Sequence, residues 1–128
     1  MADPRVPLSW GELLDKCAIL EIKRQRLNAP GALSNVLAEL AALEPAIPLP
    51  PWPANLVQLR TALTAVNQRL WTIEDQIREH EAAGDFGARF IALARAVYRE
   101  NDERGRIKRA INQIMGSALH EEKQYPSY

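Results

Sequence analysis

The residues best suited to chemistry lie in the middle of a predicted helix near the C-terminus. Asn101, Arg104 and Lys108 follow one another at spacings of three and four residues, where Leu or Ile would be expected to face a neighbouring helix. A guanidinium binds a carboxylate or a phosphate through two hydrogen bonds, and an ammonium group adds a second charge. The segment therefore predicts a site for a small anion, such as a carboxylate or a sugar phosphate.

Further polar and aromatic side chains are expected to face this segment from the preceding helix. If two antiparallel helices join at Gly84–Asp85, residues whose numbers sum to about 169 should lie opposite each other. This register sets Glu74 beside Arg95 and Asn101 near Asn67. Trp71 or Tyr98 would form an aromatic wall. The candidate ligand-binding residues are Asn67, Trp71, Glu74, Arg78, Arg95, Tyr98, Asn101, Arg104 and Lys108.

Three interpretations of this polar set remain open from the sequence. The side chains can lie along the surface, with packed stems and charged heads in water. They can surround a cleft that binds the anion. They can also form a buried network that fixes how the helices pack, because buried polar groups require partners.

Catalytic and metal-binding patterns are absent from the sequence. Cys17, the only cysteine, lies on an apolar helix face with no histidine near it in sequence, so it is expected to be structural. Glu74 and Asp75 are adjacent and point about 100° apart on a helix, so they cannot act on one bond. Glu12 and Asp15 form one carboxylate pair of the kind that helical magnesium-dependent hydrolases use, but no second pair follows. We expect no cofactor and no metal.

Two long helices are expected to carry most of the candidate residues. The first, about 54–83, has apolar residues at alternating spacings of three and four. Gly84 ends it, Asp85 caps the next, and the second helix runs over about 85–115, until Gly116 and Ser117. The pattern predicts an antiparallel hairpin with arms of nearly equal length. Its first helix has the seam Leu56, Leu59, Leu63, Val66, Leu70, Ile73, Ile77 and His80.

Two shorter helices are expected before the hairpin, over about 9–28 and 31–44. Ser9 and Glu12 form a capping-box pattern that starts the first of them. Ile19 and Ile22 lie opposite its main apolar seam, so this helix should bury two faces. The second face, together with the long seam of the hairpin, predicts a homodimer.

The two remaining segments are expected to lack long helices. Five of the nine prolines lie between 45 and 53, which favours a stiff extended crossover. Residues 48–52 are alternatively a proline-rich ligand for an aromatic groove. The tail 117–128 is polar and can form at most two helical turns.

Composition supports one all-α domain over residues 1–128. Sixteen basic residues balance sixteen acidic ones, so no charge excess favours nucleic acid. Hydrophobic residues make up 47% of the chain but aromatics only 6%, as in cores of packed aliphatic helices. A single cysteine fits a reducing compartment, and no apolar run is long enough to cross a membrane. We expect a cytoplasmic protein.

Several strings resemble an uncharacterised bacterial family of small all-helical proteins, a domain of unknown function. They are residues 11–16 (GELLDK), 19–23 (ILEIK), 70–75 (LWTIED), 90–95 (FIALAR), 97–98, 101–102, 107–109, 111–112, 116–117, 121–123 and 125. The resemblance covers nearly the whole chain except the proline segment. It assigns no catalytic residue, and it implies a link to sugar-transferring proteins.

A second resemblance concerns only the first helix. Residues 14–27 are similar to the first helix of helical chorismate mutases, in which arginines and a lysine bind a dicarboxylate; Arg24, Arg104 and Lys108 would take these roles. The sequence thus predicts a non-enzymatic helical module that binds a protein partner or a small anionic ligand. A small helical enzyme acting on an anionic metabolite is the alternative.

Overall fold

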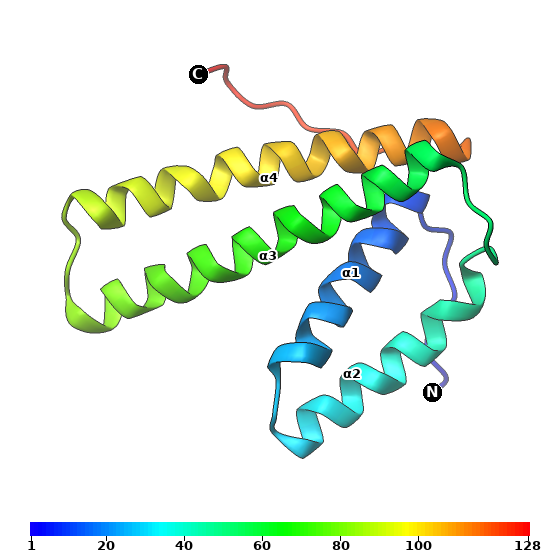
Figure 1. Ribbon diagram of the computed structural model, residues 1–128, viewed down its shortest axis with the longest axis horizontal. Helices are drawn as coiled ribbons and strands as arrows, with labels where there is room; N and C mark the ends of the chain where they lie inside the picture. Colours follow the sequence, from blue (N-terminus) through cyan, green and yellow to red (C-terminus); the bar gives the residue numbers. More distant parts are fainter.

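The protein folds as four α-helices and contains no strand, which confirms the expected fold class. The computed structural model describes all 128 residues. The helices are α1 (Trp10–Arg26), α2 (Pro30–Leu43), α3 (Ala54–Ala83) and α4 (Ala88–Met115), and a short 3-10 turn, η1 (Glu44–Ala46), follows α2. Figure 1 shows α3 and α4 as two long antiparallel rods, with α1 and α2 below one end of them. No helix is both long enough and apolar enough to span a bilayer.

The α3–α4 hairpin forms at the expected place. Gly84 ends α3 with φ at 66°, a left-handed conformation that favours glycine. Asp85 was predicted to be the N-cap of α4, but the N-cap is Gly87. The Asp85 carboxylate accepts a hydrogen bond from the Gly87 backbone N–H at 3.1 Å. Arg69 and Glu100 form an ion pair at 3.0 Å across the hairpin. Their numbers sum to the expected value, which confirms the register.

The main core lies where α1 crosses the hairpin near the start of α3 and the end of α4. The largest cluster of buried side chains joins these three helices, and α2 packs mainly on α1. All its members are aliphatic because each helix presents an apolar stripe to the others. They are Leu14, Leu56, Leu63, Val66, Ile107 and Ile111.

The second face of α1 is covered within the chain. Ile22 is only 2% exposed, so it does not offer the free surface on which the dimer was predicted. Ile19 is half-buried. The predicted main seam of α1 follows spacings of three and four over Leu13, Cys17, Leu20, Arg24 and Leu27. Its first three residues are buried, whereas Arg24 lies on the surface and pairs with Glu21 at 2.7 Å.

The proline segment and the tail connect and flank these helices. Residues 44–46 continue α2 as the 3-10 turn, and the chain from 47 to 53 then runs without regular structure to α3. Trp52 packs on its own chain, since its indole Nε1 donates a hydrogen bond to the Pro48 carbonyl at 2.8 Å. The tail, residues 117–128, contains no helix and runs back along α4 (Figure 1).

Candidate functional site

Asp15 of α1 is the centre of the polar cluster. Its side chain is 1% exposed, and it lies between the two helices of the hairpin. Arg104 Nε lies 3.0 Å from both carboxylate oxygens, and Arg104 Nη2 donates to Oδ2 as well. Asn67 Nδ2 donates to Oδ1 at 2.8 Å. One buried carboxylate therefore links α1 to both α3 and α4.

Lys108 forms the second part of the cluster. Its side chain is 8% exposed, and Nζ lies 2.7 Å from Glu12 Oε2, 3.2 Å from Glu121 Oε2 and 3.7 Å from Asp15 Oδ2. Burial alone would lower the pKa of this ammonium group. The hydrogen bond that Lys108 donates to Glu12 and the charges of the carboxylates outweigh that effect and raise the pKa above its usual value. Lys108 is thus held in its charged form.

The Arg104 guanidinium is held in the same way. The hydrogen bonds to Asp15 raise the pKa of Arg104 further above its usual value, against the opposing effect of burial. Its Nη1 lies 3.4 Å from Asn101 Oδ1, and Asn101 Nδ2 donates to the Val97 carbonyl at 3.0 Å. Asn101 and Asn67 are therefore joined through Arg104 and Asp15 rather than directly.

The N-terminus of α1 is capped by one side chain from the end of α4 and one from the start of the tail. The first N–H groups of a helix have no partner within it. The backbone N–H of Trp10 donates to Ser117 Oγ at 2.9 Å, and that of Gly11 donates to Asn112 Oδ1 at 2.7 Å. A Cβ atom on Gly11 would lie 2.5 Å from the Lys108 carbonyl oxygen, closer than atoms can approach. Glycine at this position therefore allows the two helices to meet.

The capping box is only half formed. Ser9 Oγ accepts a hydrogen bond from the Glu12 N–H at 3.2 Å, as expected. The Glu12 carboxylate was expected to turn back to the Ser9 N–H, but it bonds Lys108 instead. A charge-assisted bond to a buried ammonium group is stronger than one to a neutral amide, which explains the difference.

The other predicted site residues are not brought to this cluster. Glu74 does not reach Arg95; both are exposed, and Glu74 pairs with Arg78 one turn along α3 at 3.7 Å. Arg95 forms no ion pair. Trp71 lies under the Arg26 guanidinium, with 5.7 Å between Cζ and the ring centroid. Of the nine candidates, Asn67, Asn101, Arg104 and Lys108 belong to the cluster.

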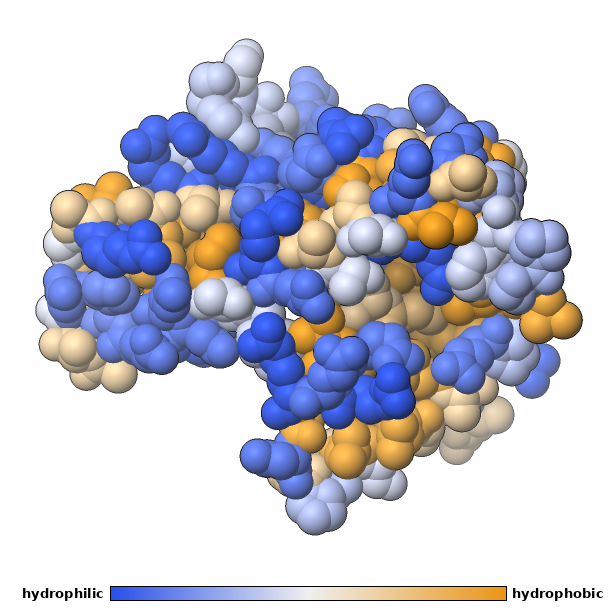
Figure 2. Space-filling model, viewed as in Figure 1, coloured by the Kyte–Doolittle hydropathy of each residue, from blue (hydrophilic) through white to orange (hydrophobic).

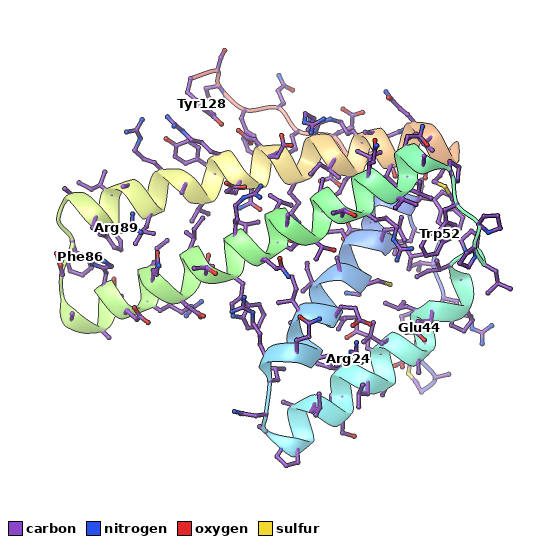
Figure 3. All side chains as sticks on the ribbon, in the orientation of Figure 1. Arg24, Glu44, Trp52, Phe86, Arg89 and Tyr128 are labelled. Carbon is purple, nitrogen blue, oxygen red and sulfur yellow. The ribbon has the colours of Figure 1, made fainter.

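Tyr98 lies in a separate groove between α4 and the tail. Its ring stacks edge to face with that of Tyr128 at 5.2 Å, and Lys123 Nζ donates to the Asn101 carbonyl at 3.3 Å. The Tyr128 hydroxyl donates to Asp102, and this bond raises the pKa of Tyr128. Figure 3 shows Tyr128 above α4. The groove has a volume of about 600 Å³.

Sequence reasoning missed the carboxylates that complete the cluster. The polar residues of α4 were expected to find their hydrogen-bond and ion-pair partners on α3. Most of these partners are instead Glu12 and Asp15 of α1 and Glu121 of the tail. The signal was present, because Glu12 and Asp15 are one helical turn apart and form a carboxylate pair on one face. Arg104 and Lys108 are also one turn apart, so the two pairs match in spacing and are opposite in charge.

Both cations of this cluster are compensated within the chain. Arg104 and Lys108 each have a carboxylate partner from the chain, and three carboxylates face the two cations. Of the three interpretations of the polar set, the buried network accounts for these contacts without a ligand. No group of three or more His, Cys, Asp and Glu side chains is placed to hold a metal ion.

Comparisons with known proteins identify no relative of the chain. No family model, no curated protein and no solved structure matches the chain.

Proposed function

We propose that the protein is a non-enzymatic helical module that binds a protein partner, and that this partner is a second copy of the chain. The observation that carries the proposal is the uncovered half of the α3–α4 hairpin. We call it the distal arm: residues 68–83 of α3, residues 88–99 of α4 and the turn between them. In Figure 1 the arm extends to the left, beyond α1 and α2.

The apolar seam of the arm is only partly covered by the chain itself. Among its apolar seam residues only Leu93 is buried, at 3% exposed. Ile91 and Phe86 are more than half exposed, and Figure 2 shows apolar atoms between charged ones along this part of the molecule. Two helices alone cannot enclose a seam, whereas four can. The half-buried residues of the seam are Leu70, Ile73, Ile77, Phe90 and Val97.

The charges of the arm favour a second copy as its partner. Residues 68–83 contain four carboxylates and two arginines, whereas residues 88–99 contain three arginines and no carboxylate. Arg95 and Arg99 form no ion pair within the chain, and neither do Asp75, Glu79 and Glu81. Two arms related by a twofold axis would place the acidic α3 of one chain beside the basic α4 of the other.

A cytoplasmic location is part of the proposal. Its support is the single cysteine, Cys17, which is a buried free thiol. The resemblance to the bacterial family makes a sugar-transferring protein the heterologous partner to test, and capture of such a protein would add a second role to self-association.

Sedimentation equilibrium of the full chain tests the proposal. We expect a dimer at tens of micromolar that weakens as salt rises from about 0.05 to about 0.5 M, because exposed charge pairs are screened. The double variant Arg95→Glu, Arg99→Glu should be monomeric. Arg109→Glu, an exposed arginine of α4 outside the arm, is the matched control and should stay dimeric. A monomeric wild-type chain, or a dimer that the double variant leaves intact, would refute the proposal.

A further inference from the structure

A cavity separate from the polar cluster and from the arm lies between α1, α3, the end of α2 with η1, and the proline segment. Its volume is about 330 Å³, within the range of small-molecule sites. Eight of its fourteen lining residues are hydrophobic, among them Leu14, Leu40, Leu63 and Trp52. Figure 3 shows Trp52 at this end of the molecule, beside the proline segment. The cavity is thus a mostly apolar hollow in the best-packed half of the fold.

Arg60 is the cation of this cavity, and it has no acceptor. Its guanidinium Cζ lies 4.2 Å from the centroid of the Trp52 ring, which holds it against the aromatic face. No carboxylate lies within ion-pair distance, and Nη1 is buried without a hydrogen-bond partner. Arg104 and Lys108 are also partly or fully buried, yet both have carboxylate partners. Arg60 is therefore a preorganised donor whose bonding capacity the chain leaves unused.

The position of Arg60 is fixed by its surroundings. The Trp52 indole is itself held by its hydrogen bond to the Pro48 carbonyl at 2.8 Å. The buried Cys17 thiol lines the same cavity, and burial raises its pKa, so it stays neutral and supplies no countercharge. Burial lowers the pKa of Arg60, because a desolvated guanidinium lacks a countercharge. An entering anion would supply that countercharge.

The other charges of the lining restrict which anion can enter. Glu21 and Glu44 also line the cavity. Glu21 is neutralised by Arg24 at 2.7 Å, whereas Glu44 has no ion-pair partner. A phosphate or a dicarboxylate would bring two charges toward one arginine and an unpaired carboxylate. A single carboxylate matches the guanidinium in charge and in planar geometry.

We propose that this cavity binds a small molecule with one carboxylate on an apolar body, the carboxylate on Arg60 and the apolar body among Trp52, Leu14 and Leu63. The proposal goes beyond self-association and does not depend on the distal arm. Two sources share this chemistry: a free apolar acid, and an apolar amino acid whose ammonium group would face Glu44.

Titration of the full chain with matched probes tests the site by nuclear magnetic resonance. The probes are 3-phenylpropanoate, phenylalanine, 3-phenylpropanol and inorganic phosphate. We expect saturable shifts at Trp52, Arg60 and Cys17 with 3-phenylpropanoate or phenylalanine. The alcohol and phosphate should bind at least about tenfold more weakly, since the first lacks the charged hydrogen bond and the second carries too much charge. Stronger binding of the amino acid, lost in Glu44→Gln, would identify the second source.

Two variants on the same helix show whether Arg60 carries the binding. Arg60→Met should weaken the acid about tenfold or more, while its melting temperature stays the same or rises, because no partner is stranded. Arg69→Met, an exposed arginine of α3 outside the cavity, should bind as the wild type does. Equal binding of the acid and the alcohol, equal binding by Arg60→Met, or no saturable shift with either carboxylate at millimolar concentration would overturn the proposal.

Discussion

The two halves of the α3–α4 hairpin have the same helical pattern but different surroundings. In the half near the start of α3, Leu63, Val66, Ile107 and Ile111 are at most 1% exposed, because α1 lies across the seam. In the distal arm the corresponding seam residues are half-buried, except Leu93, which is 3% exposed. The apolar seam thus determines which residues of the hairpin can be buried, whereas the position of α1 determines which of them are buried within one chain.

The polar residues follow the same division. Under α1, polar side chains are buried and joined through Asp15, whereas in the arm the ion pairs are exposed, as for Arg78 and Glu74. A buried network stabilises one arrangement of helices only if every member has a partner. We therefore assign stability and helix register to the covered half, whereas the arm is the surface proposed for association.

The largest expected effect is that of removing Asp15. Asp15→Ala leaves Arg104, Lys108 and Asn67 facing each other without their shared carboxylate, and loss of one partner in a buried pair costs about 3–5 kcal/mol. Urea denaturation measures the change. The control is Glu103→Ala, which breaks an exposed pair with Arg106 and should cost about 1 kcal/mol or less. A loss of that smaller size in Asp15→Ala would mean that the network does not hold the helices together.

The next effect is that of a single methyl group at the crossing of α1 and α4. Gly11→Ala places a Cβ atom 2.5 Å from the Lys108 carbonyl oxygen, and a backbone atom there can move only if the helices separate. We expect a loss of about 1–3 kcal/mol in the free energy of unfolding. Gly31→Ala in α2 meets nothing within 4 Å and should leave stability unchanged or slightly higher. Equal effects of the two substitutions would contradict the close approach.

Lys108 makes stability depend on alkaline pH. Its pKa in the folded protein is above the usual 10.5, so its contribution is complete below about pH 10.5 and is lost as the pH rises through the folded value. The Cys17 thiol, whose pKa burial also raises, acts in the same direction. Urea denaturation from pH 9 to about pH 12 should show this loss, and Lys108→Arg should shift it to higher pH because a guanidinium keeps its proton. Lys16→Arg replaces an exposed lysine paired with Glu39 and should leave the pH of this loss unchanged.

The smallest expected effect is on the surface of the arm. Glu74→Gln removes only an exposed pair with Arg78 and should change the free energy of unfolding by less than about 0.5 kcal/mol. Had Glu74 met Arg95 in a buried cleft, one of the three arrangements that the sequence leaves open, the loss would be several times larger. A large loss of the free energy of unfolding, measured by urea denaturation, would favour the cleft instead.

Much of the fold could be predicted from local signals. Gly84 and Gly116 end their helices as expected, and the turn at Gly84–Asp85 sets the register that the Arg69–Glu100 pair confirms. These features depend on spacing within one helix or on one tight turn. They need no knowledge of how distant segments meet.

The site could be predicted only in part, because its other half comes from a helix almost ninety residues away. Asn101, Arg104 and Lys108 occupy positions where apolar residues are expected, and the hairpin register places Asn67 opposite Asn101. Their partner Asp15 lies on α1, whose crossing position no local pattern specifies. Ile22 was wrongly expected to remain free for a partner chain, because the covering of its face depends on the same crossing.

Amide hydrogen exchange of the full chain at two concentrations tests most directly whether the covered half and the arm have different roles. At about 5 and about 500 µM, the amides around Leu63 and Ile111 should be equally protected, since their protection comes from within one chain. The amides between Leu70 and Val97 should exchange faster at the low concentration and gain protection at the high one. Protection of the arm that does not change with concentration would contradict its assignment as the surface for a second copy.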